Sequence, residues 1–131
     1  MKEKVIKEFE KDNGFIYKNN FKIIELDDNH CKMEYKIRKD GLNPIDIVHG
    51  GILFGLADTC AGALACMSGK FPLTTSSNIN YLSQAKGKKI YAIANILKVG
   101  NNIGYYTVDI FDDSNKKVAN ATVNMYFTNY K

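Results

Sequence analysis

The feature that most limits how this chain can fold is a run from Ile47 to Ser68, IVHGGILFGLADTCAGALACMS, which is uncharged except for Asp58. The length of the run, its alanines and leucines, and Lys70 just beyond it favour a helix over residues 49–68. Apolar residues occur on every side of this helix, so we expect other structure to surround it. A curved sheet wrapped around the helix would bury all of its sides.

Alternating segments supply such a sheet. From Cys31 to Ile37 apolar and polar side chains alternate, as in a strand with one exposed face. Turn-separated strands are also predicted over residues 21–27, 74–83, 88–99, 103–112 and 117–127. Val5, Ile6 and Phe9 predict a short amphipathic helix within residues 1–14, which Gly14 would end. The pattern as a whole predicts one α+β domain over residues 1–131, with about six antiparallel strands, a central helix and an N-terminal helix.

Composition limits the possible partners. The 131 residues, 45% hydrophobic and 24% charged, suit one ordered domain. The net charge of +4 comes from scattered lysines, and the densest stretch, Lys86, Lys88 and Lys89, has no interleaved aromatic residues. We therefore expect no nucleic-acid partner. Residues 47–69 are only marginally long enough for a membrane span and carry Asp58 and five glycines, so we expect no membrane association either.

The cysteines indicate the compartment. Cys31, Cys60 and Cys66 form no CxxC pair, and the N-terminus, MKEKVIKEFEKDNG, is charged with no apolar secretory segment. We expect a cytoplasmic protein with reduced thiols. His30 and Cys31 would point to opposite faces of a strand, and no cluster of ligands has metal spacing, so we expect no metal.

Asp58 lies beside small residues in the predicted helix. Gly51, Gly55, Asp58 and Gly62 fall near one stripe at three- to four-residue spacing. The stripe lacks bulk, so a backbone, a second helix or a ligand can come close to Asp58. A buried carboxylate is costly, and such a group usually has a partner, a shifted pKa or a task.

A longer pattern resembles a known family. The string Asn43-(x)5-His49-Gly50-Gly51-(x)6-Asp58, with NINYLSQAKGKK over residues 78–89 and VANATVNMYF over residues 118–127, is similar to the phenylacetate-degradation-type (PaaI-like) acyl-CoA thioesterases. The resemblance covers roughly residues 15–128. It implies a hot-dog fold and hydrolysis of an acyl-CoA thioester to free acid and CoA. It implies no cofactor beyond the CoA of the substrate.

The resemblance also implies roles for individual residues. Asp58 would be the nucleophile or the general base, and the backbone N–H of Gly50 would bind the thioester oxygen. Asn43 would lie near the same site, and His49 would be a structural or orienting residue of the turn. The site of such enzymes forms between two subunits of a homodimer, which can pair again into a homotetramer.

The spacing of these residues independently favours a shared site. Asp58 follows Gly50 by roughly 10–12 Å along a helix, too far for both to reach one carbonyl. A two-fold dimer with antiparallel helices removes the difficulty.

The sequence departs from the family pattern at two positions. Some related enzymes have a hydroxyl one turn after the acid, where this chain has Gly62, so we assign the water-holding role to Thr74 or Thr75. Gln84 stands where many relatives have proline.

Substrate contacts are predicted for a second group of residues. The acyl pocket would include Leu53, Phe54 and Tyr81, with Gly51 beside it. The CoA phosphates would meet Lys98, Gly100 and Asn101, or alternatively Lys86 and Lys88. The acyl group itself is left open by the sequence.

Two other functions compete with hydrolysis. The first is an acyl-CoA-binding protein without turnover, acting through another protein. The second is an enoyl-CoA hydratase or dehydratase, which Asn43-Pro44-Ile45 faintly suggests; however, Asp46 occupies the position where the hydratase motif has histidine.

Overall fold

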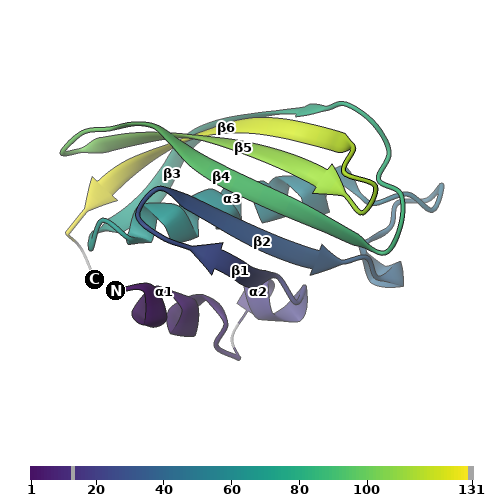
Figure 1. Ribbon diagram of the computed structural model, residues 1–131, viewed down its shortest axis with the longest axis horizontal. Helices are drawn as coiled ribbons and strands as arrows, with labels where there is room; N and C mark the ends of the chain where they lie inside the picture. Colours follow the sequence, from purple (N-terminus) through teal and green to yellow (C-terminus); the bar gives the residue numbers. More distant parts are fainter. Residues whose placement is uncertain (13, 130–131) are drawn as a thin grey trace.

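The structure is a computed structural model that describes residues 1–12 and 14–129 (Figure 1). In chain order, its elements are α1 (Lys2–Phe9), α2 (Gly14–Lys18), β1 (Lys22–Leu26), β2 (His30–Lys36), the 3-10 turn η1 (Lys39–Gly41), α3 (Gly50–Cys66), β3 (Phe71–Tyr81), β4 (Lys89–Val99), β5 (Ile103–Asp112) and β6 (Lys117–Thr128). Residue 13 of the predicted N-terminal helix and residues 130–131 of the predicted domain lie outside the described residues.

The strands of the described residues form one sheet in the order β1-β2-β4-β5-β6-β3. Every neighbouring pair is antiparallel. The sheet curves over α3, which lies against its concave face (Figure 1). This arrangement confirms the predicted α+β fold, because an apolar helix needs a curved sheet to cover it. The order also leaves β1 and β3 as the two edge strands.

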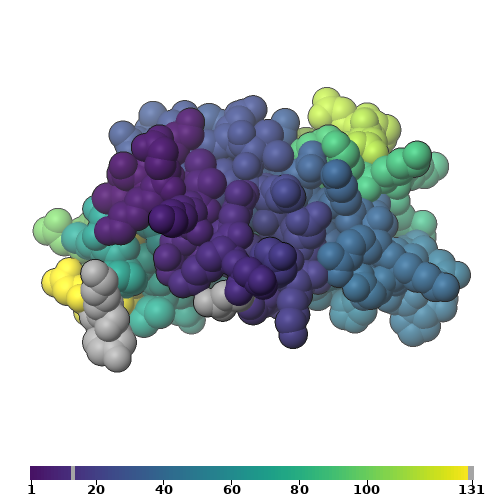
Figure 2. All heavy atoms as spheres, turned by 90° about the horizontal axis from the view of Figure 1, so that it is seen from below, coloured from purple at the N-terminus to yellow at the C-terminus, as the bar shows by residue number. Residues whose placement is uncertain are grey.

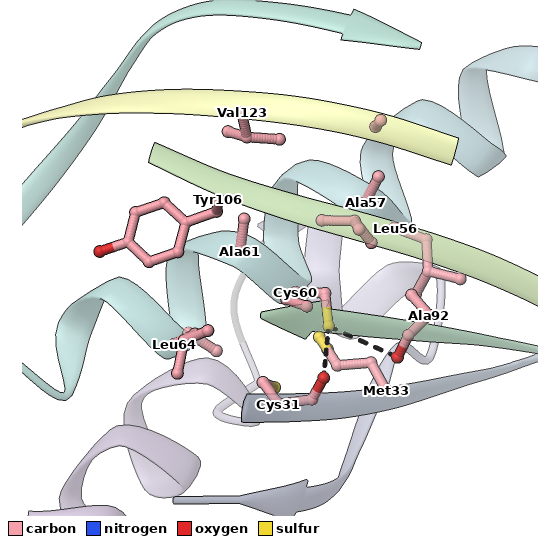
Figure 3. Packing of buried hydrophobic residues seen from close by; sticks show 14 of the residues in the cluster. Cys31, Met33, Leu56, Ala57, Cys60, Ala61, Leu64, Ala92, Tyr106 and Val123 are labelled. Carbon is pink, nitrogen blue, oxygen red and sulfur yellow. Dashed lines mark hydrogen bonds between the residues drawn. The ribbon is translucent and has the colours of Figure 1, made fainter. Parts of the chain in front are cut away.

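The core fills the space between sheet and helix (Figure 3). Leu56, Ala57 and Cys60 of α3 are fully buried against the inner faces of the strands. The thiol of Cys60 donates to the carbonyl oxygens of Cys31 at 3.2 Å and Ala92 at 3.5 Å. Burial raises the pKa of this thiol well above its usual range, so Cys60 stays a neutral core residue.

The N-terminal segment differs from the prediction. Helix α1 ends at Phe9, and Gly14, predicted to stop a helix, instead begins the short helix α2 with φ +79°. The prediction missed α2 because five residues are too few to show an amphipathic period. In Figure 2 this purple segment covers much of the face seen from below.

The N-terminal helices also decide what meets the glycine stripe of α3. A Cβ atom at Gly55 would lie 2.8 Å from the ring of Phe15, and one at Gly62 would lie 3.8 Å from Phe9. Of the occupants that the sequence left open for this stripe, α1 and α2 of the same chain take the positions beside Gly55 and Gly62. No helix in the described part of the chain is long and apolar enough to cross a bilayer.

Candidate active site

The loop before α3 is held by its own polar groups. The side-chain oxygen of Asn43 accepts hydrogen bonds from the N–H groups of Ile45 at 3.0 Å and Ile47 at 3.2 Å. Asp46, at the tip of this turn, has φ 63°. A local side-chain acceptor of this kind stabilises a tight turn. Asn43 therefore shapes the loop that leads into the helix.

His49 is the N-cap of α3. Its Nδ1 accepts a hydrogen bond from the N–H of Gly51 at 2.7 Å, and its own N–H donates to the Gly41 oxygen at 2.9 Å. An accepting Nδ1 implies a neutral ring that carries its proton on Nε2. These contacts favour the structural role for His49 over a role as base.

Gly50 offers the free donor at this helix end. The N–H of Gly51 is bonded to the side chain of His49. The N–H of Gly50, one residue earlier in the first turn, has no acceptor among residues 1–12 and 14–129. Free N–H groups and the helix dipole make this end electropositive. Tyr81 covers its carbonyl side: the Tyr81 hydroxyl donates to the Gly50 oxygen at 3.0 Å. A Cβ at position 50 would lie 3.1 Å from the Tyr81 ring, so the close approach depends on glycine.

A pocket of about 310 Å³ opens beside this helix end. It lies between the loop before α3 and the segment that follows β3. Of the predicted site residues, Asn43, Gly50, Leu53 and Tyr81 line it. The remaining lining residues are Ile47, Val48, Leu82, Ser83, Gln84 and Ala85.

Asp58 lies farther along α3 and does not line this pocket. The sequence predicted that the carboxylate of Asp58 is buried. This prediction is wrong, because Asp58 is only partly buried, beside the open edge strand β3. Its Oδ1 accepts a hydrogen bond from the Thr74 hydroxyl at 2.7 Å. The partner of the lone acid is therefore a hydroxyl group.

A β-bulge in β3 separates the two threonines. The register with β6 shifts between Thr74 and Ser76, so Thr75 is the extra residue. Thr74 reaches Asp58, while the Thr75 hydroxyl donates to the Asn124 oxygen at 3.2 Å. Within one chain, Thr74 is thus placed beside the acid and Thr75 is tied to β6.

The other predicted contacts lie away from this pocket. Phe54 is 37% exposed on α3, and Gly51 is exposed with its N–H bonded to His49. Lys98 is the last residue but one of β4, and Gly100 and Asn101 lie in the β4–β5 turn. There the Asn101 oxygen accepts a hydrogen bond from the side chain of Lys70, beyond the C-terminal end of α3. One chain does not bring the Lys98 group to the pocket beside Gly50.

Sequence reasoning missed most of the segment that follows β3. Leu82, Ser83 and Ala85 line the pocket, and Gln84 was considered only as a departure from the family pattern. The turn residue Gly87 marks this segment as a connection between strands. Sequence alone contains no signal that the connection folds back toward the start of α3. Among the described residues, no three histidine, cysteine or acidic side chains are placed to hold a metal ion.

Comparison with known proteins identifies the family. Residues 46–119 match the model of the Thioesterase superfamily. The chain is 30% identical over 128 residues to an Archaeoglobus fulgidus protein provisionally named an esterase, covering 92% of this chain and 83% of that protein. It is 32% identical over 99 residues to acyl-coenzyme A thioesterase PaaI of Escherichia coli, covering 74% and 70% of the two chains.

A solved structure agrees with these sequence relatives. The crystal structure of a hypothetical thioesterase protein with coenzyme A from Streptococcus pneumoniae superposes with a TM-score of 0.80 at 28% identity, covering 86% of this chain and 88% of that one. The curved sheet around one helix is thus the hot-dog fold that the sequence resemblance implied. The chain belongs to the Thioesterase superfamily, and it is a thioester hydrolase of the PaaI-like type.

Proposed function

We propose that this protein hydrolyses acyl-CoA thioesters, with the N–H of Gly50 polarising the thioester carbonyl. The observation that carries the proposal is the N–H of Gly50, which has no acceptor among the described residues and starts an apolar helix beside a pocket of about 310 Å³. The coenzyme A in the pneumococcal relative supports CoA as part of the substrate. A donor placed at a helix N-terminus stabilises the negative charge that develops on the oxygen during attack.

Asp58 supplies the second half of the reaction. As a nucleophile, its carboxylate attacks the carbonyl carbon, CoA leaves as the thiolate, and water hydrolyses the resulting anhydride. As a general base, it takes a proton from a water molecule that attacks the same carbon. Either route gives a free acid and CoA. The Thr74 hydroxyl, 2.7 Å from Asp58, orients the carboxylate and, with Thr75 nearby, is our candidate for holding water. The Asp58 carboxylate and the Gly50 N–H suffice for hydrolysis of a thioester, so we propose no cofactor.

The active site is shared between two copies of the chain. Gly50 and Asp58 are eight residues apart on α3, about 12 Å at 1.5 Å per residue, so one carbonyl cannot reach both in one chain. Edge strand β3 has no partner on its outer side among the described strands, and its Phe71 and Leu73 are 44% and 59% exposed. Exposed apolar side chains on a long edge strand favour pairing with another strand. Pairing through β3 would bring the α3 helices of two subunits near each other.

The other predicted residues take supporting roles. Asn43 and His49 hold the loop that presents Gly50, and Gly51 contributes its N–H to that cap. Leu53 and Tyr81 line the pocket, and Phe54 would face substrate in the assembled dimer. The phosphates of CoA would meet Lys98, Gly100 and Asn101 of the partner subunit, or Lys86 and Lys88 near the pocket.

A reducing, cytoplasmic setting suits the three free thiols, two of which are buried.

A panel of acyl-CoAs tests the proposal directly. Purified protein should release CoA from at least one aromatic or medium-chain acyl-CoA, detected with a thiol reagent, and dialysis against EDTA should leave the rate unchanged. Binding of several acyl-CoAs without CoA release would favour the non-catalytic binding protein. Addition of water to an enoyl-CoA without thiol release would favour the hydratase.

Mixing two inactive variants tests the shared site. Asp58→Asn and Gly50→Pro subunits each lack one of the two groups of the active site. A random 1:1 mixture of these subunits in dimers should therefore recover about a quarter of the wild-type rate. Half of the dimers would be mixed, and each of those would contain one intact site. Differently tagged subunits co-purified as heterodimers provide the proof of mixing. Heterodimers as inactive as their parents would show that each site belongs to one chain; a mixture of Asp58→Asn with Asp58→Ala is the control.

A further inference from the structure

One wall of the pocket is a connection without regular structure. Residues 82–88 join β3 to β4 and cross the end of the sheet at the right of Figure 1. Four consecutive residues of this connection, from Leu82 to Ala85, line the pocket beside Gly50. The width of the pocket therefore depends on what holds this segment in place.

Strand β6 holds the first half of the segment. The N–H groups of Leu82 and Ser83 donate to the Val118 oxygen at 2.9 and 3.3 Å. The Ser83 hydroxyl donates to the Lys117 oxygen at 3.0 Å. This first attachment ends before Gln84.

Two adjacent carboxylates at the end of β5 hold the second half. Oδ2 of Asp112 accepts from the N–H of Lys86 at 2.8 Å. Oδ2 of Asp113 accepts from the N–H groups of Lys88 at 2.6 Å and Lys89 at 3.0 Å. Hydrogen bonds to a carboxylate are stronger than those between neutral groups. Gln84 and Ala85 of the pocket wall lie between the two attachments.

Asp112 is itself fixed in place. It is 2% exposed, and its Oδ1 accepts from the N–H of Ser114 at 2.9 Å, the Ser114 hydroxyl at 2.7 Å and the N–H of Lys116 at 3.1 Å. Burial acts to raise the pKa of Asp112, but the Ser114 hydroxyl and the backbone donors outweigh it and lower the pKa to about 2. A lowered pKa means that the charged form, and with it the attachment, persists from neutral pH down to strongly acidic conditions.

Gly87 allows the segment to come this close. Its φ is +91°, a region that disfavours other residues, and a Cβ atom there would lie 2.6 Å from Oδ2 of Asp113. The glycine and the two carboxylates thus form one arrangement, built from two turns far apart in sequence.

We propose that Asp112 is a positioning residue for substrate, which holds the segment of residues 82–88 against β5 and so sets the wall of the acyl-CoA pocket. The inference rests on the proposed function, since it assigns this pocket to the acyl-CoA. Asp112 lies outside the pocket lining and touches no reacting group. Its effect is therefore on binding, and the chemistry of Asp58 and Gly50 should proceed normally once substrate is bound.

The substitution Asp112→Asn tests this role at nearly constant volume. Three donors converge on Oδ1 and one on Oδ2, so the remaining oxygen of the asparagine should stay with Ser114 and Lys116. The amide NH₂ would then face the N–H of Lys86. Because both groups are hydrogen-bond donors, they would repel each other and push the segment away from β5. Loss of one charge-assisted bond should raise KM about tenfold and change kcat less than about twofold.

The experiment compares three variants with the wild-type protein. Asp109→Asn is the matched control, because Asp109 lies on the same strand and its carboxylate contacts the side-chain Nζ of Lys117 at 3.3 Å, whereas the segment uses the backbone oxygen of Lys117; its KM should be unchanged. Gly87→Ala should raise KM in the same direction as Asp112→Asn through its clash with Asp113. Each variant is measured for kcat, KM, direct binding of CoA by calorimetry and thermal unfolding.

The outcomes separate this inference from the proposed function. A folded Asp112→Asn with wild-type KM would overturn the positioning role, as would a wild-type KM in Gly87→Ala if Asp112→Asn fails to fold. A fall in kcat with unchanged KM would overturn it as well. If the wild-type protein cleaves no acyl-CoA, the proposed function fails, and the inference is then decided by CoA binding alone: weaker binding by Asp112→Asn than by Asp109→Asn supports it, and equal binding overturns it.

Discussion

Replacing Asp58 with asparagine should lower the kcat for acyl-CoA hydrolysis by about 10²–10⁴-fold, the range for loss of a general base, and further if Asp58 is the nucleophile. The asparagine oxygen can still accept the hydrogen bond that Thr74 donates to Asp58, so the geometry of α3 and β3 should be kept. An amide, however, neither takes a proton from water at neutral pH nor attacks a thioester. The measurement is CoA release under saturating substrate.

Two controls make this result specific. CoA binding by Asp58→Asn, measured by calorimetry, and its thermal unfolding should match the wild-type protein, because the substitution alters neither the pocket lining nor the core. Asp109→Asn, an exchange of the same kind on β5, should hydrolyse at the wild-type rate. If Asp58→Asn turns over as fast as the parent, the assigned mechanism is wrong. The contact of the Thr74 hydroxyl with Asp58 would then not support a catalytic role for Thr74.

The second large effect is expected at Gly50, where a pair of substitutions isolates one backbone hydrogen. Gly50→Ala adds a Cβ that would lie 3.1 Å from the Tyr81 ring but keeps the N–H. Gly50→Pro adds the same atom and removes the N–H. Proline is tolerated at the first position of a helix, and the preceding His49, with φ −63° and ψ 137°, already has the extended conformation that proline requires of its neighbour.

The comparison should show a kcat about 10²–10³-fold lower for Gly50→Pro than for Gly50→Ala, the usual cost of one oxyanion donor. Both variants share whatever displacement of Tyr81 the new Cβ causes, so the ratio reports the donor. Thermal unfolding of the two should be similar, because no acceptor for this N–H is present in the described residues. Equal rates for the two variants would remove Gly50 from the catalytic machinery and direct attention to other donors of the first helical turn.

The strands could be predicted from sequence because their signal is local. The alternation of Cys31, Met33 and Tyr35 with polar neighbours predicts a half-exposed strand, and in the structure these three side chains are fully buried on β2. Side chains of a strand alternate between faces whatever the strand packs against. The same local logic failed for α2, whose five residues span little more than one helical turn.

The candidate site divides in the same way. The run from His49 to Asp58 could be found in the sequence because a capped helix start and an acid at fixed helical spacing are properties of one segment. The pocket wall and its support could not be found, because they depend on contacts between segments. Asp112 and Asp113 look like an ordinary turn in the sequence, and only the fold brings the N–H groups of Lys86 and Lys88 to their carboxylates.

By itself, the sequence determined the elements of this protein, the central apolar helix and the chemistry that one segment can offer, since periodicity, capping and helical spacing act over a few residues. Tertiary structure alone decided that Asp58 lies partly exposed beside Thr74, that Phe15 covers Gly55, and that the buried carboxylate of Asp112 accepts a hydrogen bond from the N–H of Lys86. Burial and hydrogen-bond partners depend on which distant segments pack together, and local patterns contain little of that information.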